Sequence, residues 1–228
     1  MFLKKWDALP EQMKTEAVKP YYKSLEKKRF SLCLKRCFDI VVSILLLIIL
    51  FLPLLVFAVL IRLDSPGPAM FRQKRVTQYG KIFRIYKFRT MVQNAEQIGS
   101  QVTTDQDSRV TKIGRFLRNY RLDELPQLLN ILSGDMSFVG TRPEVLKYVE
   151  QYTDEMYATF LMPAGVTSQA SIRYKDEAQL LQSATSPDEV YVQTILPEKM
   201  RYNLDSIRHF SFANDCRTML QTVFAVIR

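Results

Sequence analysis

Two adjacent carboxylates, Asp123 and Glu124, are the residues best placed to carry chemistry in this chain. Pro126 follows them, and proline is favoured in the first turn of a helix, so the sequence predicts a helix that begins near residues 123–125. A helix N-terminus attracts phosphate, and two neighbouring carboxylates can divide the roles of nucleophile and divalent-metal ligand. An ordinary N-cap role for Asp123 explains the same spacing and stays open.

Basic side chains lie upstream of this pair. Between residues 71 and 91, seven Lys or Arg residues are interleaved with aromatic residues, which suits a short hairpin or an interfacial helix. Four cations then recur every three residues and predict one stripe along a helix over 110–122: Lys112, Arg115, Arg118 and Arg121. A solvated charged face is the ordinary explanation for such a stripe. Its position directly before two carboxylates favours phosphate binding.

Two further motifs could hold ions. Residues 134–143 are punctuated by glycine and could present backbone N–H groups and Arg142 to an anion, although a tight structural loop explains them equally well. Asp105 and Asp107 formally match the Asp-x-Asp metal motif of nucleotide-sugar enzymes. Three residues match by chance too often, and the surroundings indicate a polar loop, so a metal site there is the weaker interpretation.

The composition narrows the class of chemistry. A chain of 228 residues that is 47% hydrophobic predicts one globular domain. Three cysteines and the single His209 cannot complete a disulfide set or a four-ligand zinc site, and no Gly-x-Ser-x-Gly motif supports a Ser-His-Asp hydrolase. Catalysis would therefore rest on carboxylates, arginines and a metal, in a reducing, cytosol-facing setting.

Charge is distributed unevenly along the chain. Residues 1–121 hold 23 basic and 9 acidic side chains, whereas residues 122–228 hold 9 and 14, which together give the net charge of +9. A basic half chain indicates a polyanionic partner, which can be nucleic acid, a phospholipid surface or a phosphorylated substrate.

Residues 40–61 form the most apolar segment, in which only Ser43 and Pro53 are not strongly apolar. As a helix the segment would be roughly 33 Å long, enough for a bilayer core, and its position some 40 residues into the chain excludes a signal peptide. Lys and Arg residues flank both ends, and such cations stay cytoplasmic. A re-entrant helix broken at Pro53 would keep both flanks in the cytosol. An ordinary kinked span stays an alternative.

The order of the motifs resembles the monotopic phosphoglycosyl transferases, bacterial sugar transferases that start glycan assembly on a polyprenyl phosphate. The resemblance covers roughly residues 31–170. The matching stretches are Lys35-Arg-Cys-Phe-Asp-Ile40 before the apolar segment, Gly67-Pro-Ala-Met-Phe-Arg-Gln73, Tyr86-Lys-Phe-Arg-Thr-Met91, Arg109-Val-Thr-Lys-Ile-Gly-Arg-Phe-Leu-Arg118, Leu122-Asp-Glu-Leu-Pro-Gln-Leu-Leu-Asn130 and Gly134-Asp-Met-Ser-Phe-Val-Gly140 with Arg142-Pro143.

The resemblance implies a reaction. Asp123 would attack the β-phosphorus of a UDP-sugar, release UMP and hold a covalent phosphosugar, which a polyprenyl (undecaprenyl) phosphate then accepts. Asp123 and Glu124 would hold Mg²⁺. Candidates for contacting phosphates are Arg142, Arg118, Arg121, Lys87 and Arg89.

The resemblance also implies an architecture and a location. We expect a mostly helical α+β fold in a monotopic membrane protein, with interfacial amphipathic helices. Residues 1–30 would form an amphipathic lead-in, residues 31–62 the re-entrant helix, and residues 63–228 a catalytic domain on the cytosolic face of the bacterial cytoplasmic membrane. One apolar segment suits the small form that holds only the catalytic domain. Membrane lipids are expected partners, nucleic acid is not, and a homodimer stays open.

Three departures from the family pattern matter. Leu52 stands where many members have serine before the helix-breaking proline, and Thr141 stands where many have proline. Residues 165–175 diverge, so it stays open whether Arg173 or Lys175 replaces a family arginine, and the donor sugar cannot be read. A non-enzymatic membrane adaptor that binds anionic lipid or nucleic acid is the alternative function, but it leaves the motif order unexplained.

Overall fold

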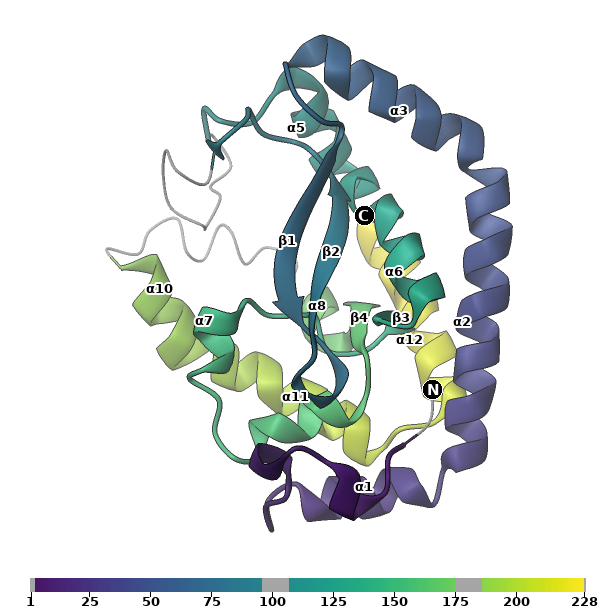
Figure 1. Ribbon diagram of the computed structural model, residues 1–228, viewed down its shortest axis with the longest axis vertical. Coiled ribbons are helices and arrows are strands. Elements are labelled where there is room, and N and C mark those ends of the chain that lie inside the picture. The colour runs from purple at the N-terminus through teal and green to yellow at the C-terminus, as the bar shows by residue number, and fades with distance from the viewer. Residues whose placement is uncertain (1–2, 96–106, 175–185, 228) are drawn as a thin grey trace.

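The computed structural model describes residues 3–95, 107–174 and 186–227. Within these residues, helices dominate and the strands form two small two-stranded sheets (Figure 1). This confirms the predicted mostly helical α+β class.

Two long helices form the apolar segment. α2 (Arg29–Ile49) and α3 (Phe51–Asp64) are bent by 63° at Leu50. Pro53 lies in the first turn of α3, and its missing N–H is the one that would bond the carbonyl of Ile49, so the break falls one turn before the proline. The predicted break is confirmed. No single described helix is long and apolar enough to cross a bilayer, whereas α2 and α3 together have the length and composition of a broken span or a re-entrant loop.

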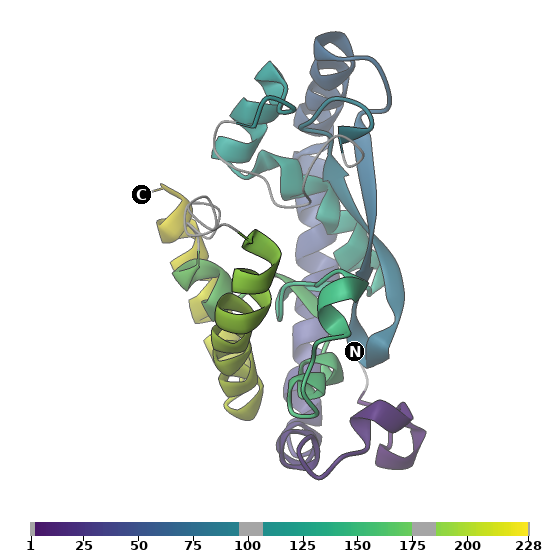
Figure 2. The same ribbon diagram turned by 90° about the vertical axis from the view of Figure 1, so that its left-hand side faces the viewer.

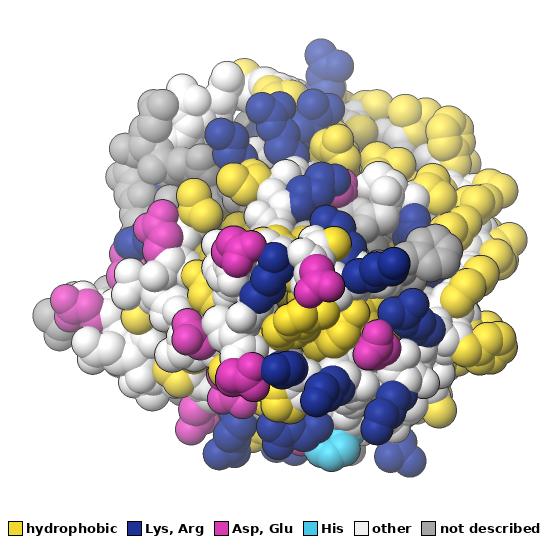
Figure 3. Space-filling view, turned by 60° about the horizontal axis from the view of Figure 1, so that its bottom comes forward, with side chains coloured by type: hydrophobic (Ala, Val, Ile, Leu, Met, Phe, Trp, Pro, Cys, Tyr) yellow, Lys and Arg dark blue, Asp and Glu magenta, His cyan; other side chains and the backbone are white. Residues whose placement is uncertain are grey.

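α2 and α3 form an arc along one side of the molecule (Figure 1). α6 (Leu128–Ser133) packs against α2, and α5 (Lys112–Asn119) packs against α3. The outer side of the arc exposes large apolar side chains, and Figure 3 shows hydrophobic side chains along this edge. They include Val41, Leu45, Ile48, Ile49, Phe51, Leu52, Leu55, Val56 and Val59.

The basic and aromatic stretch forms a β-hairpin, which settles the two alternatives predicted for it. β1 (Met70–Val76) and β2 (Ile82–Phe88) are antiparallel, with Met70 opposite Phe88. The turn holds η3, a short 3₁₀ helix (Gln78–Gly80), in which Tyr79 and Gly80 adopt positive φ angles of 59° and 73°.

The segment around the carboxylate pair differs from the prediction in two ways. α5 ends at Asn119, and Arg121 has a left-handed backbone with φ of 56°, so Arg121 leaves the predicted helical stripe. A 3₁₀ helix, η4 (Leu122–Gln127), then precedes α6. Arg121 holds the N-cap position, so the N-cap role for Asp123 is wrong: Asp123 lies inside the first turn of η4.

A small parallel sheet follows α6. β3 (Met136–Val139) pairs with β4 (Ala164–Thr167), so part of the stretch predicted as a glycine-rich turn is a strand. Gly140 and Gly165 touch where β3 ends: a Cβ atom on Gly165 would lie 2.1 Å from the Gly140 nitrogen. Only residues without a side chain allow this approach.

The remaining elements are helical, and several of them contribute to the main core. α11 (Leu196–Arg208) and α12 (Phe212–Ile227) lie across the molecule from the hairpin (Figure 2). The predicted helix around 214–227 is thus confirmed, and the one around 177–181 lies outside the described residues. Shorter helical elements are η1 (Trp6–Ala8), η2 (Glu11–Met13), α1 (Lys19–Glu26), α7 (Leu146–Val149), η5 (Met156–Leu161), α8 (Gln169–Arg173), α10 (Pro187–Val190) and the π-helical η6 (Tyr191–Ile195).

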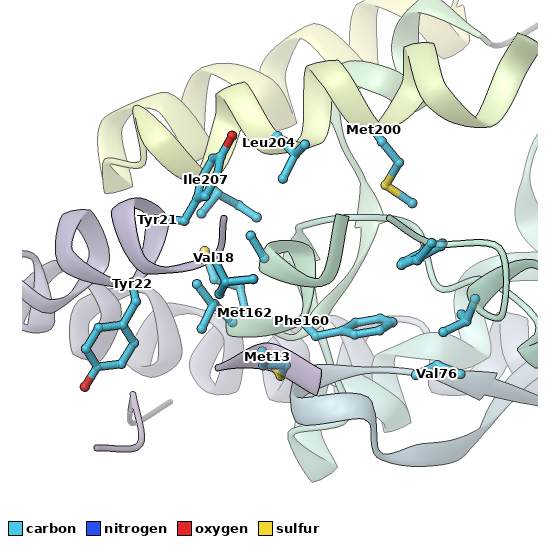
Figure 4. Close-up of a cluster of buried hydrophobic side chains, with 14 of the residues drawn as sticks. Met13, Val18, Tyr21, Tyr22, Val76, Phe160, Met162, Met200, Leu204 and Ile207 are labelled. Atoms are coloured by element: carbon cyan, nitrogen blue, oxygen red, sulfur yellow. The ribbon is translucent and has the colours of Figure 1, made fainter. Parts of the chain in front are cut away.

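The lead-in is part of this core. Met13, Val18 and Leu25 are fully buried, and Figure 4 shows Met13 and Val18 in one cluster with side chains of α11 and η5. The apolar side chains of residues 3–26 therefore pack largely against protein.

Candidate active site

Glu124 is clamped from two sides of the molecule. Lys87 on β2 donates to its Oε1 at 3.0 Å. Arg142, which follows β3, donates to Oε1 through Nη2 and to Oε2 through Nη1 at 3.3 Å. Glu124 is 11% exposed, so it is a largely desolvated carboxylate held by two cations. Such charge-assisted pairs are among the stronger hydrogen bonds in proteins.

The two carboxylates have opposite electrostatics. Burial favours the neutral form of Glu124, but Arg142 and Lys87 outweigh it and hold the pKa of Glu124 well below its usual range. Burial raises the pKa of Asp123, against the opposing influence of Lys87. Among the described residues, Asp123 has no ion-pair partner. Neighbouring groups with pKa values pushed apart commonly have different chemical roles. Glu124 is suited to a fixed charge and Asp123 to reaction.

A cavity of about 440 Å³ opens beside Asp123. Lys87 and four arginines line it, and we call it the basic cavity; the arginines are Arg75, Arg89, Arg109 and Arg118. Burial lowers the pKa of Lys87, with Glu124 opposing the shift. A phosphorylated ligand placed here would meet several cations and one carboxylate.

A second cavity, of about 350 Å³, opens beside Glu124 and Arg142. We call it the apolar cavity because, in contrast to the basic cavity, half of its lining residues are hydrophobic: Leu46, Leu125, Leu128, Ile131, Phe138, Val166, Ile172 and Ala225. Lys87 lines the basic cavity, Arg142 lines the apolar one, and both bind Glu124. The clamp on Glu124 therefore stands between the two cavities.

The structure separates the predicted phosphate ligands. Arg118 lines the basic cavity, and its Nε donates to the Thr90 hydroxyl at 2.8 Å. Arg121 lines the apolar cavity instead. Lys112 and Arg115, the other members of the predicted stripe, are exposed.

Arg89 has a different set of partners. Its guanidinium donates to the carbonyl oxygens of Ser65 at 2.6 Å and Pro66 at 2.8 Å, and the side chain is only 7% exposed. These contacts satisfy carbonyl groups at the end of α3, which have no partner within the helix. They give Arg89 a structural role, and its contact with phosphate stays a prediction.

Several positioning residues were missed by sequence reasoning. Arg36 on α2 donates to the carbonyl oxygens of Ile131 at 2.6 Å and Leu132 at 2.8 Å, at the end of α6. Lys35 donates to the Val139 carbonyl at 2.7 Å and pairs with Asp215 of α12 at 2.6 Å. The sequence places both cations in the flank of the apolar segment and in the Lys35–Ile40 stretch that matches the family, but it gives them no role in positioning the site. Their place in that matching stretch is the available signal.

The donor set suits a metal that is shared with substrate. No group of three or more Asp, Glu, His or Cys ligands occurs in the described residues. Mg²⁺ is often held by one or two carboxylates together with substrate phosphates, and Asp123 and Glu124 can supply that number. Asp107 is engaged by Arg109 at 2.6 Å, and Asp105 lies outside the described residues.

The divergent segment is described only as far as residue 174. Arg173 lies at the end of α8, and its guanidinium carbon is 4.8 Å from the ring centre of Tyr202. Lys175 lies outside the described residues, so the choice between the two as the family arginine stays a prediction.

Comparison with known proteins finds relatives that are named as sugar-phosphate transferases acting on undecaprenyl phosphate. The chain is 39% identical over 199 residues to UDP-N-acetylgalactosamine-undecaprenyl-phosphate N-acetylgalactosaminephosphotransferase of Aeromonas hydrophila, covering 85% of this chain and 44% of the relative. It is 36% and 40% identical to UDP-glucose:undecaprenyl-phosphate glucose-1-phosphate transferases of Escherichia coli K12 and Caulobacter vibrioides, covering 84% and 83% of this chain and 39% and 68% of those relatives.

The chain thus spans less than half the length of the Aeromonas and Escherichia proteins. Residues 30–228, most of the chain, match the family described as bacterial sugar transferase. The matched range includes the broken helix pair, the hairpin, the carboxylate pair and both cavities. The chain therefore belongs to the bacterial sugar transferase family.

Proposed function

We propose that this protein transfers a sugar-1-phosphate from a UDP-sugar to polyprenyl phosphate and releases UMP. One observation carries the proposal. Asp123, which has no ion-pair partner among the residues that the structure describes, lines a cavity rich in arginine, while its neighbour Glu124 is fixed by Lys87 and Arg142. This arrangement suits attack on a phosphorus centre, where a nucleophile must approach a substrate of like charge.

The reaction takes place in two displacements. A carboxylate oxygen of Asp123 forms a bond to the β-phosphorus of the donor, and the bond from that phosphorus to the bridging oxygen breaks, so UMP leaves with the electron pair. An oxygen of polyprenyl phosphate then attacks the same phosphorus and releases Asp123. Lys87 and Arg118 lie on the cavity where charge develops and are placed to stabilise it.

Mg²⁺ belongs to this proposal. Asp123 and Glu124 would hold the ion together with phosphate oxygens, and it would neutralise phosphate charge. The Oε1 atom of Glu124 accepts from both Lys87 and Arg142, whereas Oε2 accepts from Arg142 alone, at 3.3 Å, so Oε2 and the Asp123 carboxylate are the more available ligands. Removing divalent metal with EDTA should stop UMP release, and full activity in EDTA would contradict this part of the proposal.

The relatives support the substrate classes. Their names specify undecaprenyl phosphate as acceptor, and those of the Aeromonas and Escherichia proteins specify UDP-linked donors with different sugars, N-acetylgalactosamine and glucose. We therefore propose undecaprenyl phosphate or a similar polyprenyl phosphate as the acceptor. The donor sugar must be found by experiment.

A re-entrant membrane position is also part of the proposal, with both ends of the α2–α3 pair in the cytosol of a bacterium. The 63° bend, the exposed apolar arc and the basic residues at both ends support it. The test uses single-cysteine variants in cells: Cys33 alone, near the start of α2, and Lys74→Cys in a cysteine-free background, after the end of α3. Both should resist a membrane-impermeant thiol reagent until the inner membrane is opened. Labelling of one position in intact spheroplasts would show a spanning helix.

The reaction is tested by incubating purified protein with Mg²⁺, polyprenyl phosphate and a panel of UDP-sugars and measuring UMP. We expect UMP from at least one donor. No UMP from any donor would favour a non-enzymatic membrane adaptor, and turnover of another class of phosphorylated donor would favour a related transferase.

A further inference from the structure

Gln127, the last residue of η4, has an unusual environment for an amide. It is 1% exposed, and among the described residues neither its Oε1 nor its Nε2 has a hydrogen-bond partner. Gln127 lines the apolar cavity together with Glu124 and Arg142. Buried polar groups in native proteins almost always have partners, so an amide with two unmet atoms beside a cavity points to a group that enters the cavity.

A second buried amide nearby shows what a structural role requires. Asn130, on α6, is also 1% exposed. Its Oδ1 accepts from the Tyr86 N–H, and its Nδ2 donates to the Arg84 carbonyl, each at 2.9 Å. Asn130 thereby ties α6 to β2 with both amide atoms. Gln127 has no such contacts with the described protein, so it is free to serve a ligand.

The chemistry of the amide selects the ligand class. A hydrocarbon chain satisfies neither atom, and a fully ionised phosphate accepts from Nε2 but cannot donate to Oε1. Neighbouring hydroxyl groups both donate and accept, so they match the two atoms. Thr167, Ser171 and Thr222 also line the cavity. Their hydroxyls are bonded within the protein, Thr167 to Thr222 at 2.7 Å and Ser171 to Ser168 at 3.0 Å, and a hydroxyl that donates one bond can still accept others from a polyol. The cavity volume of about 350 Å³ lies within the range of small-molecule sites, roughly 300–1,000 Å³, which are mostly apolar with a few polar groups.

We propose that the apolar cavity is the binding site for the donor sugar and that Gln127 hydrogen-bonds its hydroxyl groups. The inference rests on the proposed function. With the phosphorus at Asp123, the sugar extends past Glu124 and Arg142 into the cavity. Ser171 and Ile172 of α8 come from the divergent segment and line the same cavity, which places residues able to vary between sugars next to Gln127.

The test is Gln127→Leu, which keeps the size of the side chain and removes both hydrogen-bonding atoms. Gln151→Leu, at an exposed glutamine outside both cavities, is the matched control. UMP release is measured for the preferred UDP-sugar and for analogues that lack single hydroxyl groups, and thermal unfolding is measured in the same detergent. We expect kcat/KM for the preferred donor to fall roughly 10- to 100-fold in Gln127→Leu. For at least one deoxy analogue, the substitution should lower kcat/KM much less. The melting temperature should stay the same or rise.

The possible outcomes separate the explanations. An equal loss with every donor, or a loss accompanied by a lower melting temperature, would show a structural role and overturn the inference. A higher KM for polyprenyl phosphate with unchanged donor kinetics would assign the cavity to the acceptor and also overturn it. Unchanged kinetics with every donor would mean that the amide binds only water, and this result would overturn the inference as well. If the wild-type protein releases no UMP from any donor, the proposed function itself fails.

Discussion

The two cavities that flank the carboxylate pair differ in chemistry although they begin at adjacent residues. Asp123 opens on the basic cavity with Lys87 and Arg118, and Glu124 opens on a cavity that is mainly apolar. The pKa of Asp123 is raised by burial, whereas the pKa of Glu124 is lowered by its two cations in spite of burial. Two carboxylates that are adjacent in the chain therefore differ in acidity and in surroundings. This difference is the basis for proposing phosphate chemistry at the first cavity and sugar recognition at the second.

Among the substitutions considered, replacing Asp123 should lower UMP release the most. Asp123→Asn should lower UMP release by roughly 10³-fold or more, because the amide is a poor nucleophile. Membrane association should persist, since the apolar arc is unchanged. Kinetics and membrane fractionation measure the two properties. Substantial turnover in Asp123→Asn would remove the functional difference between the two carboxylates.

Removing one of the two cations that hold Glu124 should lower activity strongly, but less than Asp123→Asn does. Lys87→Met leaves Glu124 with Arg142 alone and removes a cation from the basic cavity, so kcat/KM should fall by roughly 10- to 100-fold. Arg84→Met, at an exposed residue of the same strand, should change it less than about twofold. Equal losses in the two variants would mean that the hairpin needs its overall charge rather than the Lys87 contact.

Two arginines of α5, Arg118 at the basic cavity and Arg115 at an exposed position, allow a matched comparison. Arg118→Ala removes a guanidinium from the basic cavity and should raise the KM for UDP-sugar about 10-fold, the scale of one charge-assisted hydrogen bond. Arg115→Ala changes an exposed residue on the same helix and should have little effect. Steady-state kinetics at saturating polyprenyl phosphate measure both. Similar KM values would show that the stripe is only a solvated face.

The smallest expected effect concerns Asp107, which holds Arg109 at the edge of the basic cavity. Its hydrogen bonds from Arg109 lower the pKa of Asp107. The pair therefore contributes stability above the unfolded pKa of about 3.9 and loses it as pH falls through the lower folded value. Asp107→Asn should cost about 1 kcal/mol at pH 7, and the cost should become smaller as pH is lowered below about 3.9, as measured by unfolding at pH 7 and over an acidic pH series. An equal cost at every pH value would exclude the ion pair as the cause.

Local sequence rules predicted part of this arrangement. Pro53 breaks the apolar segment through a backbone effect that requires no tertiary information. The basic and aromatic pattern of residues 71–91 left a hairpin and an interfacial helix open, and the structure shows the hairpin. The conformation of Arg121, the clamp on Glu124 and the contacts of Arg89 with the end of α3 depend on residues distant in the chain. The unmet hydrogen-bonding atoms of Gln127 become visible only when its neighbours are placed, because a sequence does not show which polar groups lack partners.

The most direct test of the account is to trap the intermediate. Protein is mixed with UDP-sugar and Mg²⁺ without acceptor, quenched and digested, and the peptides are analysed by mass spectrometry. We predict a phosphosugar on the peptide that contains Asp123, its absence in Asp123→Asn, and its loss when polyprenyl phosphate is added before quenching. A phosphosugar on a peptide without Asp123, or UMP release that requires both substrates bound together with no modified peptide, would contradict the account.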